Sequence, residues 1–374
     1  MTASALILLE VSLWMEGESH IITMTSRLLG PVGKGIAWLL FLYVSYASLV
    51  AYAAGGGAEI SHFLSKTSGI HIGKDIGAII LTLVFTVVVI FGGKTVGRVN
   101  AVLFIAVIGA YVLLLYAGAD EVKPELLTYQ DWPLAPLAIP FLLTSFSFQT
   151  MVPSLVPLLK RHANALRISI IGGTTIALIV YLLWQILILG IIPVEGANGL
   201  IEANRQSVPA TQFIESHVSG QLIIPIARFF TLFAIITSYL AIGLGLFDFL
   251  ADGFSIKKSG NGVWLLGAMI AIPTLIFSTQ FERAFMVAME TSGGIGDTVL
   301  NGMIPVLMVW IGRYKLGYVR AFKIQGGKVF LVLVFLFFML SFLLEIGIQT
   351  GLISQGQYQK TDKLELLEPQ ILSE

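Results

Sequence analysis

The sequence contains no cysteine, which excludes disulfide bonds, thiol nucleophiles and cysteine-ligated metals. It is also poor in charge: only 12% of its 374 residues are Asp, Glu, Lys or Arg, whereas soluble domains have about a quarter. The 22 basic and 22 acidic residues cancel, so nothing favours nucleic acid as a partner. Because the N-terminus has neither a basic segment nor a small-residue cleavage site, we expect no signal peptide.

Signatures of soluble enzymes are also missing. The five histidines are scattered and form no metal-ligand cluster with glutamate. The sequence has no phosphate-binding loop of the Gly-x-x-x-x-Gly-Lys type and no Gly-x-Ser-x-Gly nucleophile elbow. We therefore expect no metal, no cofactor and no enzymatic activity, although these absences alone leave a membrane-embedded enzyme open.

Hydrophobic residues make up 56% of the chain and gather in long runs. A transmembrane helix needs about 20 apolar residues, and lipid admits only helices or closed barrels. The runs are too long for strands, so they predict an all-α, polytopic transmembrane bundle. The charge-free runs are Gly35–Ala58, Ile76–Gly93, Val99–Ala119, Trp132–Leu159, Ile168–Val194, Phe229–Phe247 and Ser259–Phe281, and Ala284–Gly312 and Val329–Gly351 join them if one or two internal acids are tolerated.

The first apolar run, Ala3–Met15, is shorter than a usual span and contains Glu10. We expect it to be part of a helix that starts before Met1, which makes about ten helices with the first incomplete. Residues 1–352 then form one transmembrane domain, and residues 353–374 a polar, acidic tail. Basic residues concentrate in alternate loops, and the positive-inside rule places those loops in the cytoplasm.

The segment Pro136–Lys160 combines prolines with a polar centre. Proline removes a backbone donor, so the prolines predict an interrupted helix, and transporters use such breaks to bind substrates. The alternative is a kinked helix whose Ser and Thr side chains bond to their own turns. The candidate substrate-binding residues in this segment are Thr144, Ser145, Phe146, Ser147, Phe148 and Gln149.

Three other features have both a structural and a functional interpretation. For the glycine-rich stretches Gly55–Gly57 and Ser292–Asp297 we favour close helix packing or a helix bend over ligand binding. Tyr46 lies in the middle of a predicted helix, where its hydroxyl needs a hydrogen-bond partner. That partner is either a substrate carboxylate, which makes Tyr46 a further binding candidate, or a neighbouring carbonyl group.

Acidic side chains within predicted helices are costly in hydrocarbon and often mark proton pathways. Asp248 is the favoured candidate for proton coupling, with Glu10 and Glu59 as further candidates. Glu59 lies near the external surface, where simple solvation is an alternative, and Arg228 could form a structural pair with one of these acids. The full set in or near the predicted helices is Glu10, Glu59, Asp248, Asp252, Glu290 and Glu345.

Four segments resemble a known family. AIPFLLTSFSFQTMVPSLVPLL at Ala138–Leu159 and AIGLGLFDFLADGF at Ala241–Phe254 are similar to the bacterial hydroxy- and aromatic-amino-acid permeases, and most of all to their tyrosine- and tryptophan-specific branch. AYAAGGGAEI at Ala51–Ile60 and ALILLEVSL at Ala5–Leu13 are similar to further, less specific segments of these proteins. The resemblance runs from Met1 to about Leu352.

The resemblance implies a permease of the amino acid–polyamine–organocation superfamily, with the inverted five-plus-five repeat of the leucine-transporter fold. Pro136–Lys160 would be the second of the two broken helices at its substrate site. Tyr46 would lie on the third family helix, which lines this site, and Asp248 on the neighbouring eighth. The first family helix has no counterpart here, since Met1 aligns within the second.

Two hypotheses of different classes follow from these features. The first is a multi-pass transporter of the bacterial inner membrane that imports tyrosine and/or tryptophan with protons by alternating access. Its partners would be the aromatic amino acid, protons and the lipid bilayer. The second is a truncated or degenerate membrane protein that does not transport, and DNA upstream of the codon for Met1 would distinguish the two.

Overall fold

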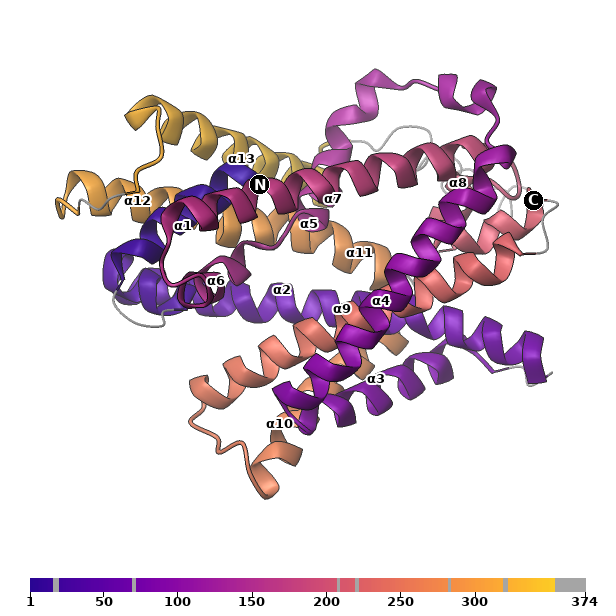
Figure 1. Ribbon diagram of the computed structural model, residues 1–374, viewed down its shortest axis with the longest axis horizontal. Helices are drawn as coiled ribbons and strands as arrows, with labels where there is room; N and C mark the ends of the chain where they lie inside the picture. Colours follow the sequence, from indigo (N-terminus) through magenta and orange to yellow (C-terminus); the bar gives the residue numbers. More distant parts are fainter. Residues whose placement is uncertain are drawn as a thin grey trace, which may run out of the picture. The chain divides into compact units, whose positions relative to one another are not determined.

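The computed structural model describes residues 1–15, 20–68, 72–206, 209–218, 222–281, 284–318 and 322–353. Within these ranges the chain forms helices and no strand, so the predicted all-α class is confirmed (Figure 1). The α-helices are α1 (Thr2–Trp14), α2 (Ile21–Ser68), α3 (Lys74–Ile90), α4 (Gly93–Gly118), α5 (Ile139–Ser145), α6 (Val152–Leu158), α7 (Ala163–Ile191), α8 (Leu200–Arg205), α9 (Ile223–Gly253), α10 (Asn261–Gln280), α11 (Ala284–Thr291), α12 (Ile304–Tyr314) and α13 (Gly327–Gln349).

Short helices of other types connect these elements. The π-helix η6 (Ser292–Met303) joins α11 to α12 without a loop. The 3-10 helices are η1 (Ala119–Glu121), η2 (Pro124–Thr128), η3 (Trp132–Ala138), η4 (Gln149–Met151) and η5 (Ala210–Ser216).

Eight helical segments of the described chain are long and apolar enough to cross a membrane. The helix α3 has 17 residues, at the lower limit for a span, and α1 has 13. The chain is therefore a polytopic helical membrane protein, as predicted. The eight segments are Ile21–Ser65, Gly93–Glu121, Trp132–Leu158, Ala163–Ile191, Ile223–Gly253, Asn261–Gln280, Val287–Tyr314 and Gly327–Gln349.

The predicted run Gly35–Ala58 lies in a helical stretch that has a kink before the run. The helix α2 that contains this run already begins at Ile21, and its backbone leaves helical geometry at Gly30, which precedes Pro31. Gly30 has a φ of 72°, a conformation that glycine adopts without a Cβ penalty. The stretch Ile21–Ser68 therefore consists of two helices that meet at a kink at Gly30, and the predicted run lies in the second of them.

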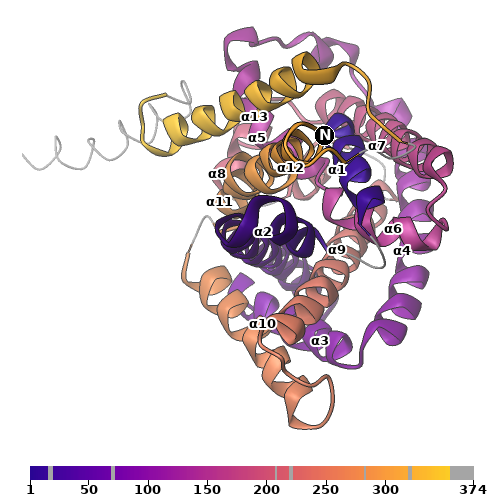
Figure 2. The same ribbon diagram turned by 90° about the vertical axis from the view of Figure 1, so that its left-hand side faces the viewer.

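The chain divides into two compact units. The first comprises Met1–Val44, Gln130–Ile179 and Glu290–Glu374. In it, α1 packs against α6 and α12, and η6 packs against α5, α12 and α13 (Figure 2). Leu143 of α5, Met303 of η6 and Phe338 of α13 form a shared apolar core. The π-helix thus lies at the centre of the first unit.

The second unit comprises Ser45–Tyr129 and Val180–Met289. Here α9 packs against α3, α4 and α10, and α4 crosses α9 in Figure 1. The predicted close packing at the glycine triplet is confirmed, because a Cβ on Gly57 would lie only 2.5 Å from the backbone nitrogen of Ala78 on α3. Only a residue without a side chain allows the two backbones to approach so closely.

Candidate functional site

The predicted interruption of the Pro136–Lys160 helix is confirmed. The helix α5 ends at Ser145, and α6 begins at Val152 after the short η4. Between them, Phe146 has φ −107° and ψ 23°, and Phe148 has φ −119° and ψ 0°. Pro153 has no backbone N–H to donate. It lies in the first turn of α6, where backbone N–H groups have no partner within the helix, so no hydrogen bond is lost there.

A buried network of three polar side chains connects this break to the π-helix. The hydroxyl of Ser147 donates a hydrogen bond to Oδ1 of Asp297. The side-chain amide of Asn301 donates to the same oxygen at 2.6 Å and to the Ser147 oxygen at 3.0 Å. Asp297 and Asn301 are both fully buried. The break and η6 are thus linked by hydrogen bonds to a carboxyl group that no solvent reaches.

The close approach of η6 to α5 depends on glycine. A Cβ on Gly293 would lie 2.0 Å from the carbonyl oxygen of Pro140 and 2.1 Å from Oγ1 of Thr144. A Cβ on Gly294 would lie 2.4 Å from Cγ of Glu345 on α13. The predicted role of this glycine-rich stretch in helix packing is therefore confirmed.

Sequence reasoning did not identify Asp297 and Asn301 as functional candidates. In the sequence, Asp297 is noticeable only as the last residue of the glycine-rich stretch Ser292–Asp297. The available signal was the spacing of an acid and an amide four residues apart within the predicted span Ala284–Gly312, which places both on one helical face. Their shared partner Ser147, about 150 residues earlier, is visible only in the structure.

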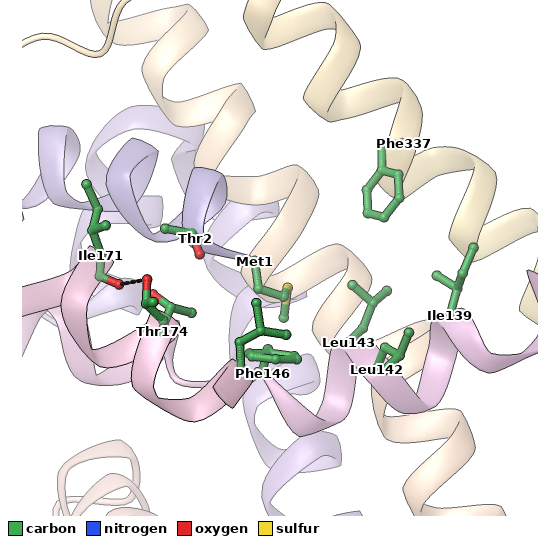
Figure 3. Close-up of a pocket in the computed structure, with 11 residues that line it drawn as sticks. Met1, Thr2, Ile139, Leu142, Leu143, Phe146, Ile171, Thr174 and Phe337 are labelled. Atoms are coloured by element: carbon green, nitrogen blue, oxygen red, sulfur yellow. Dashed lines mark hydrogen bonds between the residues drawn. The ribbon is translucent and has the colours of Figure 1, made fainter. Parts of the chain in front are cut away.

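A cavity of about 490 Å³ lies beside the break, between α1, α5, α7 and α13 (Figure 3). Figure 3 shows the Phe146 ring at its wall, next to Leu142 and Leu143 of α5 and opposite Ile171 of α7. Its surface is predominantly apolar, and the hydroxyl of Thr175 is turned to the carbonyl of Ile171. Cavities of this size accept small molecules, with apolar walls for rings and chains.

The other predicted residues of the break have different surroundings. Thr144 and Ser145 donate hydrogen bonds to the carbonyls of Pro140 and Phe141 in their own helix, as the kinked-helix alternative expects. The amide of the buried Gln149 donates to the Met1 carbonyl and the Ser4 hydroxyl of α1, at 3.2 and 3.3 Å. Phe148 is half-buried.

Tyr46 belongs to the second unit, whereas the break belongs to the first. Its hydroxyl donates a hydrogen bond of 2.7 Å to the carbonyl oxygen of Met269 on α10. The hydrogen-bond partner of this tyrosine is therefore a neighbouring carbonyl group, as the structural alternative predicts. A part of Tyr46 in substrate binding stays a prediction.

Glu10 is fully paired. Its carboxylate accepts hydrogen bonds from Nε of Arg313 at 2.6 Å, from Nη2 of the same guanidinium and from the backbone N–H of Ile324 at 2.9 Å. The side chains of Glu10 and Arg313 are only 2% and 4% exposed. This contact fastens α1 to α12, which is a structural role, and proton coupling by Glu10 stays a prediction.

The two remaining proton-coupling candidates lie in the second unit. Glu59 is buried and accepts a hydrogen bond of 3.1 Å from the amide of Gln212, and the positive charge of Arg228 stabilises its carboxylate electrostatically. Asp248 was expected to be a buried acid, and this is wrong: its side chain is 53% exposed and pairs at 2.8 Å with Lys258, whose side chain is 45% exposed. The reason is its position near the end of α9, from which it reaches the following loop. The role of either acid in proton coupling stays a prediction.

The sequence matches the model of one protein family, described as the tryptophan/tyrosine permease family, over residues 1–345. The tryptophan-specific transport protein of Haemophilus influenzae is 29% identical over 365 residues, which cover 94% of this chain and 86% of the relative. Tyrosine-specific transport system 1 of the same organism is 28% identical, covering 94% of this chain and 87% of that protein. The low affinity tryptophan permease of Escherichia coli K12 is 26% identical, with 90% and 83% covered.

The family match spans all the elements described above, from α1 into α13. It includes both the helix break and the π-helix that carries Asp297. This chain belongs to the tryptophan/tyrosine permease family.

Proposed function

We propose that this protein is a secondary active transporter of the bacterial inner membrane that imports tryptophan and/or tyrosine together with protons. Three relatives named for tryptophan or tyrosine transport cover most of this chain, and they support the substrate class. The relatives are transport proteins rather than enzymes, which supports transport without chemical conversion. Their names leave open which of the two amino acids is preferred.

The observation that carries this proposal is the broken helix between α5 and α6, with a cavity beside it. Backbone groups at membrane depth that lack helical partners persist only against a cavity or other protein. In transporters the ends of such half-helices bind the charged groups of a substrate. The α-amino and α-carboxylate groups of an amino acid supply these charges.

The substrate contacts that we propose follow from the chemistry around the break. Backbone groups there, with Ser145 and Ser147, hydrogen-bond the amino and carboxylate groups of the substrate. Phe146 and Phe148 pack against its aromatic ring, which has room in the cavity lined by Phe146. Thr144 and Gln149 complete the proposed contacts at the break, and Tyr46 stays a separate candidate for substrate binding.

Alternating access follows from the same break. Two short half-helices joined by irregular backbone can tilt separately at small cost, whereas a continuous helix would lose hydrogen bonds. Opening the site first to one face of the membrane and then to the other moves the substrate, and the movement of a proton down its gradient with the substrate supplies the free energy for accumulation.

The test is uptake of radiolabelled tryptophan and tyrosine by the purified chain in proteoliposomes, with the interior more alkaline than the exterior. We expect accumulation that a protonophore abolishes and that the other aromatic amino acid, but not lysine, inhibits. Uptake that survives collapse of the gradient would contradict proton coupling. Absence of uptake for every aromatic amino acid, with protein correctly inserted, would contradict transport.

A further inference from the structure

Four buried carboxyl groups in the described part of the chain differ in what surrounds them. Glu10 is neutralised by Arg313, and Glu59 lies in the field of Arg228. Glu345 accepts a hydrogen bond from Gln349 of its own helix. Asp297, in contrast, is bound to a residue of the helix break. A change in its charge therefore acts directly on the proposed transport site.

The Asp297 carboxyl uses only one of its two oxygens. Oδ1 accepts hydrogen bonds from Ser147 and Asn301, while Oδ2 is buried and has no hydrogen-bond partner among the described residues. A buried acceptor without a donor costs free energy, and a negative charge in this position costs much more. A proton on Oδ2 removes the charge and turns the unused oxygen into a hydroxyl group.

The charged and titratable groups on the elements around η6 do not compensate this charge. The α13 helix contributes Glu345 beside Gly294, a group of the same sign, and α2 contributes Tyr43 beside Gly296. The α1 and α12 helices contribute Glu10 and Arg313, which neutralise each other. From α5 and the break come only uncharged partners, and among the described residues no Lys, Arg or His side chain forms an ion pair with Asp297.

We propose that Asp297 binds the coupling proton and that its charge state controls the helix break through Ser147, an inference that rests on the proposed function. The proton comes from the medium to which the site is open, forms an O–H bond at Oδ2 and leaves to the medium on the other face; no other covalent bond changes. The ionised carboxylate holds Ser147 and Asn301 by charge-assisted hydrogen bonds, which are about twice as strong as neutral ones. Protonation weakens this hold, so the break moves more freely relative to η6.

The arrangement favours a proton over a metal cation. The amide group of Asn301 donates into the space between the Ser147 and Asp297 oxygens, at 3.0 and 2.6 Å. A hard metal cation requires several oxygen ligands around it, and here two of the nearby oxygens already accept hydrogen bonds from the Asn301 amide. A proton needs only one free carboxyl oxygen, and Oδ2 of Asp297 supplies it.

The first experiment compares the wild type with Asp297→Asn in proteoliposomes, with the exposed Glu125→Gln as control. Two modes are measured: accumulation of labelled tryptophan or tyrosine driven by a pH gradient, and exchange against the same unlabelled amino acid without any gradient. A gradient of one pH unit supports about tenfold accumulation with one proton per substrate, because one unit is a tenfold difference in proton activity. We expect Asp297→Asn to lose this accumulation and keep exchange, while Glu125→Gln keeps both.

The outcomes separate this inference from the proposed function. Gradient-driven accumulation by Asp297→Asn at the wild-type level overturns the inference and leaves the proposed function intact. Accumulation by the wild type that follows a sodium gradient overturns proton binding at Asp297. If the wild type neither accumulates nor exchanges an aromatic amino acid, the proposed function fails, and the inference fails with it.

A second measurement covers the case in which Asp297→Asn loses exchange as well. Infrared difference spectra of the purified protein, recorded between two pH values, report the C=O band of a carboxyl group that gains a proton. We expect one of the buried-carboxyl bands of the wild type to be lost in Asp297→Asn and to be kept at a shifted frequency in Asp297→Glu. A wild-type spectrum without any such band, or an Asp297→Asn spectrum that has lost none of the wild-type bands, overturns the inference.

Discussion

Two buried carboxylates in the first unit, Glu10 and Asp297, have opposite surroundings. Glu10 is neutralised by a guanidinium and accepts three hydrogen bonds. Asp297 accepts two hydrogen bonds from neutral groups, both on the same oxygen. A fully compensated charge holds helices together and gains nothing from a proton. A half-compensated one is stabilised by a proton, and this difference separates a structural acid from a candidate functional one.

The largest expected effect is on stability, from Glu10→Gln. The substitution leaves the Arg313 guanidinium buried without its counter-charge, which costs about 3–5 kcal/mol when one partner of a buried pair is removed. We expect poor expression and a much lower unfolding temperature in detergent. The double variant Glu10→Leu with Arg313→Met should recover most of the loss, because neither charge remains. Wild-type stability of Glu10→Gln would remove the contrast with Asp297.

The second prediction concerns the approach of η6 to α5. In Gly293→Ala the new methyl group would lie 2.0 Å from the Pro140 carbonyl, so the two elements must separate, at about 1–3 kcal/mol. Because this separation stretches the Ser147–Asp297 contact, transport should fall together with thermal stability. Gly97→Ala on α4 is the control, since an added Cβ there meets no atom within 4 Å. Equal behaviour of the two variants would show that the close contact is unnecessary.

Ser147→Ala is expected to have a smaller effect. It removes one of the two donors to Oδ1 of Asp297 while Asn301 still donates, at a cost of about 0.5–1.5 kcal/mol, and we expect the pH dependence of uptake to shift while the protein still folds. Ser341→Ala is a matched control, because this buried hydroxyl donates only to the Phe337 carbonyl of its own helix among the described residues. Uptake measured as a function of external pH decides between them. An unchanged pH profile in Ser147→Ala would contradict coupling through this residue.

Asp248→Asn should have the smallest effect. Its pair with Lys258 is exposed on both sides, and such pairs contribute about 0–1 kcal/mol. We expect uptake, its pH dependence and thermal stability close to those of the wild type. Loss of gradient-driven accumulation in this variant would assign proton coupling to Asp248 on α9 instead of Asp297.

The sequence alone predicts the all-α class, the long apolar helices and the break at Pro136–Lys160. Length, hydrophobicity and proline positions are local properties, and the bilayer converts them directly into helices and their interruption. The close packing at Gly55–Gly57 and Ser292–Asp297 is predictable for the same reason, since a missing side chain is visible in the sequence.

Partners, in contrast, are decided by tertiary structure. Nothing local distinguishes Glu10, which pairs with Arg313 about 300 residues away, from Asp297, which meets Ser147 about 150 residues away. Asp248 has the sequence context of a buried acid, yet the end of α9 leaves it exposed beside Lys258. The cost of a charge in a membrane depends on what surrounds it, and packing between distant segments sets those surroundings. The sequence therefore shows where acids occur within the spans, and only the packed helices show that Glu10 has a counter-charge while Asp297 and Glu345 form no ion pair with a described residue.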